Sequence, residues 1–402
     1  MKIFRFTYFL LLLFVFLRAL PLKSQELPLS DSSQISLLTV TPGDEVYAQY
    51  GHTAIRIVDF RREFDLVFNY GLFDFNTPNF LYKFIKGETD YICGVGGFSD
   101  FIIEYQLSER GVVEQILNLS ATEKERIWQA LVQNIQIENR TYRYNYLYNN
   151  CATKPRDLIL SNLDGKTEYA YKEPFKSLRD EIHYFTKKYL WTQFGIDLLL
   201  GAPIDNAASL SDQQFAPEIL KQSFDKANIV DSNKNIKPLV TKTNVLIALE
   251  YDEAEKKPSV FGPNLVIWIL FFIIAFISVY ESRKEKRGMT LTAIIFGIYG
   301  LIGSLIAFLW LFSEHPGTEV NFLLLWLNPL HLFFAIGIFF QKFRKYIATK
   351  YLIFSLTLQV IALFGIFFIP QQLNPATVPM LLIIAFRSIV SMLQPQSKAS
   401  HE

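Results

Sequence analysis

The C-terminal third of the chain is too apolar to fold in water, and this constrains the architecture more than any other feature. Residues from about 264 to 393 are nearly all apolar, broken only by short polar loops. Five segments are candidates for membrane-spanning helices: about 264–280, 290–312, 321–340, 351–369 and 376–393. A span needs roughly 20 apolar residues, and some of these segments are slightly short. We predict an all-α domain of five transmembrane helices at residues 261–396.

The charges in the loops between these segments set a direction across the membrane. The first loop, 281–288, and the third, 341–350, are basic. They contain Arg283, Lys284, Lys286, Arg287, Lys342, Arg344, Lys345 and Lys350. The second loop, 313–320, and the fourth, 371–376, contain no lysine or arginine. Because basic loops stay in the cytoplasm, the region before the first span is predicted to lie outside.

The N-terminus predicts the same orientation. A short basic start at residues 1–7 is followed by an apolar run at 8–17 and a polar stretch at 22–25. This order is typical of a secretory signal peptide, which we place at residues 1–24. Arg18 and Lys23 disturb the cleavage region, so an uncleaved anchor is the alternative. A cleaved signal peptide and an uncleaved anchor would both export the domain that follows.

Residues from about 30 to 260 have the mixed composition of a soluble region. The net charge of +1 gives no overall basic character, so we predict no nucleic-acid partner. Strand-like stretches lie at 35–40, 53–58, 66–70, 91–95 and 112–119. Ser120 and Glu123 form a candidate capping box for a helix that ends near Asn134. We predict a mixed α/β domain at residues 25–175. A helical connector at 176–260 either lines a site near the membrane or joins the two domains.

Two residues carry the chemistry that this region predicts. Cys151 follows two asparagines at the start of a helix-like run, and His52 lies about a hundred residues earlier in a strand-like run. A helix N-terminus lowers the pKa of a thiol and an imidazole accepts its proton, so the pair suits thiol acyl chemistry. The alternative for Cys151 is a disulfide with Cys93, which an exported protein permits. Cys93 lies in an apolar strand-like stretch, where a free buried thiol is ordinary.

A catalytic imidazole usually needs a third group to orient it. Asn69 and Tyr70 follow on the next predicted strand; we favour Asn69, for which a strand-end turn is the alternative role. Backbone N–H groups at the Cys151 helix start are predicted to hold the oxyanion, helped by Tyr50 or a neighbouring donor. Asn150 is either the N-cap of that helix or part of the site. The sequence has no P-loop, dinucleotide motif or zinc-type cysteine pair, and we expect no metal or organic cofactor.

Polar residues on the outer side of the membrane half are functional candidates, because polar groups are costly in lipid. His315 lies in a predicted loop, where plain solvation is the alternative. Asn328 and His331 are three residues apart and are expected to share a helix face. Hydrogen bonding between helices is their alternative role.

Several motifs together carry a family resemblance. They are Gly51-His52, Asn69-Tyr70-Gly71-Leu72-Phe73-Asp74-Phe75, Asn150-Cys151 with Arg156-Asp157, and Trp326-Leu327-Asn328-Pro329-Leu330-His331. Histidine before cysteine reverses the order of papain-like peptidases and resembles circularly permuted NlpC/P60-type folds over about residues 35–170. Most of the chain is similar to the Lnb family of Bacteroidetes-type bacteria, which joins a permuted papain-like N-terminal domain to five transmembrane helices.

The resemblance implies an α+β, NlpC/P60-like catalytic domain in the periplasm and a multi-pass protein of the cytoplasmic membrane. It implies an apolipoprotein N-acyltransferase, which moves an acyl chain from a phospholipid to the N-terminal amine of diacylated lipoproteins. Cys151 is carried over as the nucleophile, His52 as the base and Asn69 as the orienting group. The expected substrate-binding residues are Tyr50, Tyr70, Asn150, Arg156, His315, Asn328 and His331. Arg156 and His315 are candidates for a lipid phosphate.

Other functions fit the same residues. A cell-wall amidase or cysteine peptidase of this fold needs a polar groove, but it gives no reason for five membrane helices. A phospholipase performs the same first step and passes the acyl group to water. A non-enzymatic membrane assembly factor is expected to hold Cys93 and Cys151 in a disulfide. The match to the family is loose at Lys154-Pro155, directly after the thiol. A proline at this position shifts the helix start or restricts Lys154.

Overall fold

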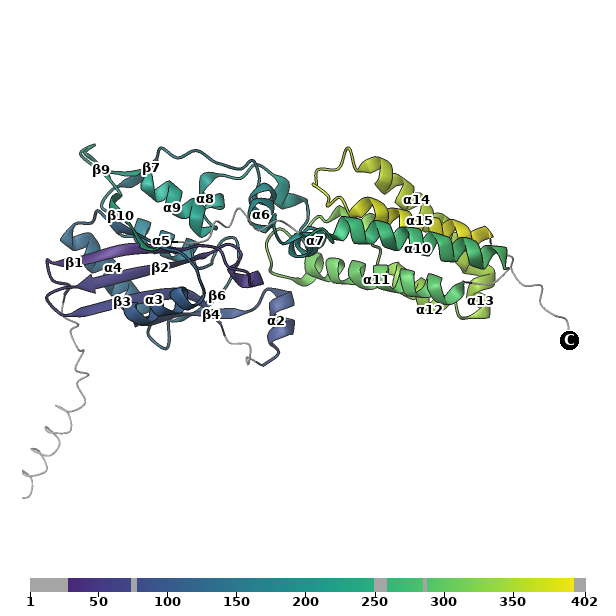
Figure 1. The fold of residues 1–402 in the computed structure, drawn as a ribbon, viewed down its shortest axis with the longest axis horizontal. Coiled ribbons are helices and arrows are strands. Elements are labelled where there is room, and N and C mark those ends of the chain that lie inside the picture. Colours follow the sequence, from purple (N-terminus) through teal and green to yellow (C-terminus); the bar gives the residue numbers. More distant parts are fainter. Residues whose placement is uncertain (1–27, 74–77, 249–258, 285–287, 394–402) are drawn as a thin grey trace, which may run out of the picture.

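The computed structural model of the chain describes residues 28–73, 78–248, 259–284 and 288–393. Some predictions concern residues outside these ranges: the signal peptide at 1–24, Asp74 and Phe75 of the second motif, and Lys286 and Arg287 of the first basic loop. Figure 1 shows the described chain as two parts that meet end to end. We call them the extramembrane domain (residues 28–248) and the membrane domain (residues 259–393).

The extramembrane domain is built around a sheet in which every neighbouring pair of strands is antiparallel. The strand order is β10 (Val240–Ile247), β5 (Val112–Leu117), β1 (Ser33–Val40), β2 (His52–Asp59), β3 (Phe64–Leu72), β4 (Asp90–Gly97) and β6 (Thr141–Arg143). The five strands predicted from the sequence are β1 to β5 of this sheet. The prediction of a mixed α/β domain is confirmed.

Helices cover both faces of this sheet. One face carries α4 (Ala121–Asn134), α5 (Thr153–Ser161) and α9 (Pro217–Asp225). The other face carries α3 (Phe98–Leu107). Neighbouring apolar residues of a strand point to opposite faces, so Leu37 packs in the first layer and Leu38 in the second. The predicted capping box of α4 is present, because the side chains of Ser120 and Glu123 each accept a hydrogen bond from the other's backbone N–H.

The segment between the sheet and the membrane domain is more than a helical connector. Its helical elements include α6 (Leu178–Thr186), α7 (Leu190–Leu199), η2 (Ala202–Asp205) and α8 (Leu210–Gln213). A second sheet pairs β7 (Lys166–Tyr169) with β8 (Ala227–Val230), and β8 with β9 (Ile236–Pro238). The chain then returns as β10 to the edge of the main sheet, beside β5. The sheets therefore join segments on both sides of the predicted boundary at residue 175.

The membrane domain contains three helical segments that are long and apolar enough to cross a membrane, counted over the described residues. They are α10 (Pro263–Arg283), α11 (Met289–Phe312) and the segment Gln341–Gly365, which comprises α13 (Gln341–Phe343), η5 (Arg344–Ala348) and α14 (Thr349–Gly365). The predicted loop at 341–350 is therefore helical.

Two further apolar segments are shorter, and they match the third and fifth predicted spans. The first, Phe322–Gly337, is broken between η4 (Phe322–Leu325) and α12 (Leu330–Gly337). The second is α15 (Thr377–Leu393). The structure thus contains apolar helices at all five predicted positions, whereas five complete crossings stay a prediction.

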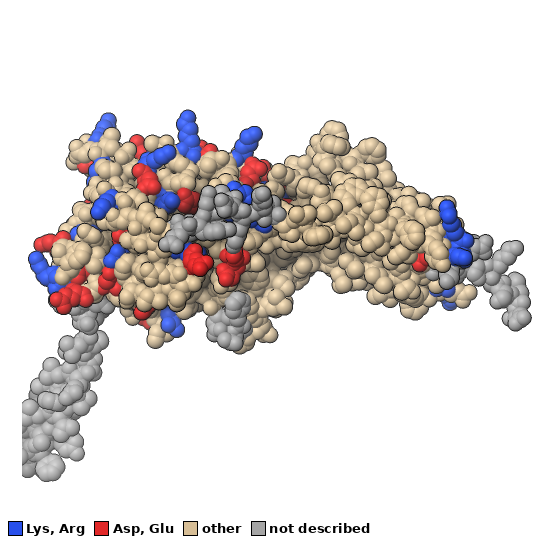
Figure 2. All heavy atoms as spheres, viewed as in Figure 1, with Lys and Arg blue, Asp and Glu red and all other residues tan. Residues whose placement is uncertain are grey.

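Charged side chains are distributed as a membrane-crossing domain requires. Figure 2 shows a broad band without charged residues between the charged extramembrane domain and a basic cluster at the far end. The ends of α10 and the α13–η5 segment carry basic residues there, including Arg283, Lys342 and Arg344. Arg387 of α15 is fully buried and donates to the side chains of Ser278, Glu281 and Thr292. Its charge is therefore paired inside the bundle, where lipid does not reach it.

Backbone hydrogen bonds join the two domains. The N–H of Gly201 donates to the carbonyl of Gly317 at 2.7 Å, and the N–H of Ala202 donates to the carbonyl of Val320 at 3.2 Å. A β-carbon at Gly201 would lie 2.0 Å from the carbonyl oxygen of Glu319, so only glycine permits this approach. The loop after α11 is therefore held directly against the segment after α7.

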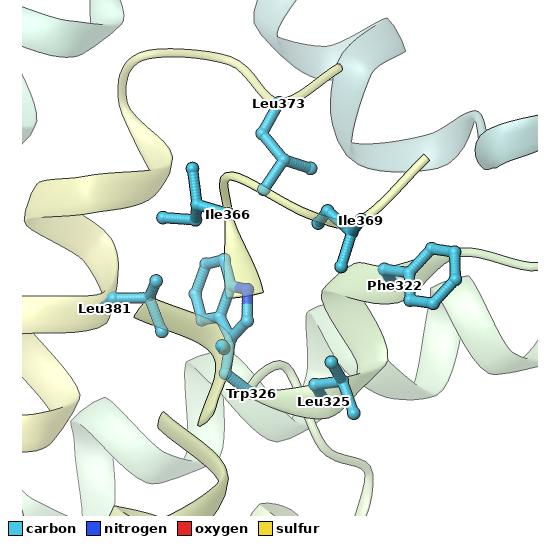
Figure 3. Close-up of a pocket in the computed structure, with 8 residues that line it drawn as sticks. Phe322, Leu325, Trp326, Ile366, Ile369, Leu373 and Leu381 are labelled. Carbon is cyan, nitrogen blue, oxygen red and sulfur yellow. The ribbon is translucent and has the colours of Figure 1, made fainter. Parts of the chain in front are cut away.

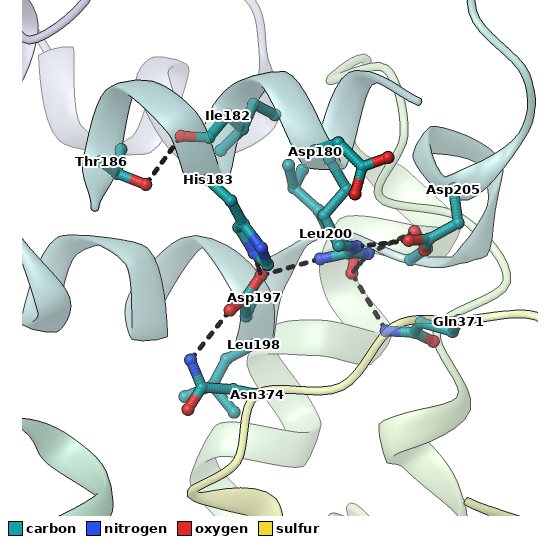
Figure 4. A network of polar contacts seen from close by, with 12 residues as sticks. Asp180, Ile182, His183, Thr186, Asp197, Leu198, Leu200, Asp205, Gln371 and Asn374 are labelled. Atoms are coloured by element: carbon teal, nitrogen blue, oxygen red, sulfur yellow. Dashed lines mark hydrogen bonds and ion pairs between the residues drawn. The ribbon is translucent and has the colours of Figure 1, made fainter. Parts of the chain in front are cut away.

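A buried polar network reinforces this junction (Figure 4). Arg179 is fully buried and donates to Asp205 at 2.8 Å, to Asp197 at 3.0 Å and to two backbone carbonyls. Asp197 also accepts from Asn374 of the loop before α15, at 2.9 Å. Gln371 of the same loop donates to the carbonyl of Leu200 at 3.1 Å. The Arg179 guanidinium thus fixes the connector groups, Asp197 and the Leu200 carbonyl, that accept hydrogen bonds from the membrane domain.

We predict that Arg179→Lys lowers the free energy of unfolding by about 3 kcal/mol, because an ammonium cannot replace the four directed donor contacts of the buried guanidinium. Thermal unfolding of the purified protein in detergent measures the change. The matched control is Arg126→Lys, which alters a partly exposed pair with Asp164 and is expected to cost less than about 1 kcal/mol. Equal melting temperatures for the two variants would contradict the assigned role of Arg179.

Candidate active site

The side chain of Asn150 defines the start of the helix that carries Cys151. Its Oδ1 accepts from the backbone N–H groups of Ala152 at 2.8 Å and Thr153 at 2.9 Å. In return, the Thr153 hydroxyl accepts from the N–H of Asn150 at 2.8 Å. This reciprocal pattern makes Asn150 the N-cap, and it places Cys151 in the first turn although regular helix begins at Thr153.

The amide nitrogen of Asn150 ties this helix start to the rest of the domain. It donates to the carbonyls of Tyr146 at 2.8 Å and Phe215 at 2.9 Å. Asn150 is 4 % exposed, so all these groups are shielded from water. Of the two roles considered for Asn150, the structure shows the capping role and a buried bridge to the connector.

His52 and Asn69 lie on neighbouring antiparallel strands and contact each other. The Nε2 atom of His52, the first residue of β2, is 3.1 Å from Oδ1 of Asn69 on β3. An amide oxygen only accepts, so Nε2 carries the proton in this contact and Nδ1 keeps a free lone pair. Asn69 thus selects the tautomer in which Nδ1 is able to act as a base.

The thiol lies beside the strand that begins with His52. The backbone N–H of Thr53, the residue after His52, is close enough to the thiol to lower its pKa. The end of β3 closes the other side, because a β-carbon at Gly71 would lie 3.4 Å from Cβ of Cys151. The structure therefore places Cys151 beside β2 and the end of β3, the two strands that carry His52 and Asn69.

Two glycines with positive φ shape the strand ends at this point. Gly51 has φ +92°, and a β-carbon there would lie 2.5 Å from the carbonyl oxygen of Val40. Gly71 also has φ +92°, and the pairing of β3 with β4 is irregular between Asn69 and Leu72. Such irregularities redirect side chains at sheet ends. Both glycines belong to the motifs that the sequence singled out.

Burial sets the protonation state of the resting pair. Desolvation raises the pKa of the Cys151 thiol to about 11, although the Thr53 N–H, its own N–H and Arg110 lower it. Desolvation lowers the pKa of His52 to about 4; the Asn69 contact raises it and Arg110 lowers it. The sequence-based expectation of a lowered thiol pKa is therefore wrong. At neutral pH the pair is a neutral thiol and a neutral imidazole.

Sequence reasoning missed Arg110, whose charge acts on both members of the pair. Its Nε donates to the carbonyl of Thr41 at 2.8 Å, and its guanidinium lies 5.0 Å from the ring centroid of Tyr105. Tyr105 in turn stacks on His52 with ring centroids 6.5 Å apart. Arg110 follows α3 in a polar loop, and no motif distinguishes it from other surface arginines in the sequence.

Two further predicted residues lie in packed surroundings of the same domain. Tyr70 is 1 % exposed and its hydroxyl accepts from Asn134 at 2.7 Å, in the core below α4. Tyr50 packs between Phe185 and Phe215, with ring centroids 5.6 and 5.7 Å away. Tyr70 belongs to the apolar layer under α4 and α5, on the face of β3 opposite to Asn69.

Arg156 belongs to the packing of α5 on the connector. Its guanidinium donates to the carbonyl of Ser211 at 2.6 Å and to Asp157 at 2.8 Å, and it is 9 % exposed. Pro155 beside it cannot donate to the Cys151 carbonyl, which agrees with the expected shift of the helix start. Arg156 therefore has protein partners for the charge that was considered for a lipid phosphate.

The predicted polar residues of the membrane half lie in three different places. His315, in the loop after α11, is 2.5 Å through Nε2 from the carbonyl of Phe84, and burial lowers its pKa. Asn328 precedes α12 and caps it by accepting from Leu330 N–H at 2.9 Å. His331 is 2 % exposed; its Nε2 donates to the Trp326 carbonyl and its Nδ1 accepts from Tyr351. Asn328 and His331 thus do not share a helix face, because the helix begins between them.

A pocket in the membrane domain lies next to this break. Its lining is apolar: Phe322, Leu325, Trp326, Ala362, Ile366, Ile369, Leu373 and Leu381. Figure 3 shows the ring of Trp326 among these side chains. His331 holds the Trp326 backbone, so its hydrogen bonds shape the pocket wall. This lining contains no titratable side chain.

Cys93 and Cys151 are both free in the structure. Cys93 lies on β4 in the core, and burial raises its pKa to about 11. The alternative in which the two cysteines form a disulfide is therefore wrong. Among the described residues no group of His, Cys, Asp and Glu could hold a metal ion.

Asn150→Asp separates capping from bridging. The carboxylate keeps the cap acceptor but loses both donors to buried carbonyls, so we expect a loss of about 2 kcal/mol or more in thermal unfolding. Asn149→Asp is the matched control, because Asn149 donates at an exposed position to the carbonyl of Arg143. We expect that control to stay within about 1 kcal/mol of the wild type. A stable Asn150→Asp protein would show that the bridge is dispensable.

The protonation state of the pair predicts how Cys151 reacts with iodoacetamide. Because the thiol is neutral at rest with a pKa of about 11, its alkylation rate should rise roughly tenfold per pH unit from pH 7 to 9. Peptide mass spectrometry measures the rate at Cys151, with buried Cys93 as the internal control. His52→Ala should leave this slope unchanged. A plateau from pH 6 to 8 that His52→Ala abolishes would instead reveal a thiolate–imidazolium pair.

Comparison with known proteins agrees with this architecture. The model of the Lnb N-terminal periplasmic domain matches residues 27–183, and the model of the Lnb transmembrane domain matches residues 255–399. No curated protein and no solved structure matches the chain. The two domain models lie in the order of the extramembrane and membrane domains and together cover most of the sequence. The chain therefore belongs to the Lnb family, as a membrane protein with a periplasmic domain.

Proposed function

We propose that this protein is an apolipoprotein N-acyltransferase of the cytoplasmic membrane that works through a thioester on Cys151. The observation that carries the proposal is that Cys151 lies beside the two strands that carry the hydrogen-bonded pair His52 and Asn69, in a domain fixed to a membrane domain. The donor is a membrane phospholipid, and the acceptor is the N-terminal amine of a diacylated lipoprotein. Family membership supports this assignment.

The first half-reaction forms the thioester. His52 Nδ1 takes the thiol proton while Sγ attacks the ester carbonyl carbon of the phospholipid. The tetrahedral intermediate collapses with loss of the lysophospholipid alkoxide, which receives the proton from His52. Because the resting thiol is neutral, proton transfer accompanies attack. The Asn69 contact keeps Nδ1 directed to this task.

The oxyanion needs donors, and the helix start supplies fewer than its position suggests. The N–H groups of Ala152 and Thr153 are already bonded to Asn150, and that of Lys154 donates to the Asn150 carbonyl. The N–H of Cys151 precedes these three groups and belongs to the same residue as the attacking sulfur. We assign this N–H to the oxyanion, with the positive charge of Arg110 as long-range support.

The second half-reaction transfers the acyl group. The lipoprotein amine attacks the thioester carbonyl, His52 Nδ1 accepts a proton from the amine nitrogen, and the Cys151 thiolate leaves. The same proton then returns to the sulfur. The products are an amide and the resting enzyme, and no oxidant, metal or cofactor enters the balance.

The permuted papain-like fold belongs to the same proposal. A cysteine at a helix start, beside neighbouring antiparallel strands that carry a hydrogen-bonded histidine and asparagine, supports it. A cell-wall amidase of this fold is the second candidate function. The position of the site beside the membrane junction favours the acyltransferase: Tyr146, a partner of Asn150, donates to the carbonyl of Pro316 in the loop after α11.

Intact-lipoprotein mass spectrometry tests the assignment in cells that make wild type, Cys151→Ala, Cys93→Ala or no protein. We expect N-terminal lipopeptides heavier by one acyl chain with wild type and Cys93→Ala, and unchanged masses with Cys151→Ala. The Cys93 variant is the matched control because it removes the other cysteine. Unchanged lipopeptide masses in all strains, with the protein present in the membrane, would exclude the transferase and favour the amidase.

A further inference from the structure

Helix α2 (Phe80–Lys86) exposes an apolar surface on the extramembrane domain. Leu81, Tyr82 and Phe84 are 70, 57 and 45 % exposed. These three residues occupy nearly half of a helix of seven residues. An apolar surface of this density on a domain outside the bilayer indicates contact with lipid or another apolar partner.

The contacts of α2 place it at the level where a lipid-facing helix ends. Ser313 directly follows α11, and its hydroxyl donates to the carbonyl of Ile85 at 3.0 Å. The N–H of Glu314 donates to the carbonyl of Lys86 at 2.8 Å. Phe312, the last residue of α11, is exposed, as is Trp310 two residues earlier. Aromatic residues gather at the membrane–water interface, so α2 lies at that height.

A row of aromatic rings leads from α2 toward the thiol. Its members are Phe84, Phe80, Phe73, Tyr91 and Tyr144, with successive ring centroids 6.0, 6.2, 5.1 and 4.0 Å apart. The row reaches the site at two points. Phe73 lies two residues after Gly71, where an added β-carbon would lie 3.4 Å from Cβ of Cys151, and Tyr144 is close enough to Cys151 for the two groups to interact electrostatically.

The charged residues of α2 fit the same position. Lys83 and Lys86 lie in its last turn, next to the exposed apolar residues. Lys86 pairs with Glu88, and Lys83 is partly exposed. Long basic side chains at an interface keep their stems on apolar surface and place their ammonium groups near lipid phosphates.

We propose that α2 lies in the periplasmic membrane–water interface, and that a phospholipid leaves the bilayer beside it to reach Cys151 along the aromatic row. The interfacial position stands on the contacts of α2 alone, whereas the lipid route rests on the proposed acyltransferase function. The occupant is a phospholipid, because the surface is continuous with the lipid-facing end of α11. In this arrangement the acyl chain passes over apolar rings and avoids bulk water.

Photocrosslinking of the full-length protein in phospholipid vesicles tests the position of α2. Leu81→p-benzoylphenylalanine should give a phospholipid adduct that intact mass spectrometry identifies. Phe60→p-benzoylphenylalanine is the matched control, since Phe60 is similarly exposed but follows the end of β2 opposite to His52. No lipid adduct at position 81, or adducts only with an added lipoprotein, would overturn the interfacial assignment.

Acylation of Cys151 tests the route in the same vesicles. Leu81→Glu should slow thioester formation from bilayer phospholipid roughly tenfold or more, because a carboxylate in the interface repels lipid phosphate and apolar chains. Acylation by a water-soluble short-chain thioester should stay within about twofold of wild type, which also reports an intact site. Phe60→Glu should change neither rate. Equal slowing with both donors would overturn the lipid route. If neither donor acylates Cys151 of the wild-type protein, the proposed function is refuted instead. The crosslinking result decides the position of α2 in either case.

Discussion

The side-chain amide of Asn150 joins three segments of the chain at the helix start next to Cys151. It holds the first turn of α5, the preceding Tyr146 turn and the Phe215 carbonyl of the connector. All of these groups are shielded from water, so each unmade hydrogen bond would be costly. The position of Cys151 relative to His52 follows from this one amide, because α5 packs on the sheet whose strands carry the imidazole and Asn69.

The same burial that orders the site makes its resting state unreactive. Because the pKa of the thiol is raised and the pKa of the imidazole is lowered, both groups are uncharged at neutral pH when no substrate is bound. In the proposed reaction, nucleophilicity then appears only when an ester carbonyl is close enough to be attacked as the proton moves. For a protein that faces an oxidising compartment, a neutral thiol is also protected, since the thiolate is the species that oxidants attack.

Local patterns in the sequence predicted the elements better than the contacts between distant ones. The first five strands, the α4 capping box and the apolar segments followed from hydrophobic period and cap chemistry, and His52 with Asn69 followed from neighbouring strands. β10 was not predicted because half of its residues are exposed and its apolar residues do not alternate with polar ones. Arg110 and the role of Arg156 escaped because partners distant in sequence define them. The thiol pKa was misjudged because a helix start is visible in sequence, whereas desolvation is not.

The place of β10 in the sheet has a consequence for the order of folding. Export delivers the chain from its N-terminal end, and β5 is then an open sheet edge until residues 240–247 arrive to cover it. Those residues emerge only shortly before α10 enters the bilayer. Closure of the sheet therefore coincides with anchoring, and a copy that folds early has an unpaired strand and no finished active domain. The topology thus couples maturation of the site to arrival at the membrane.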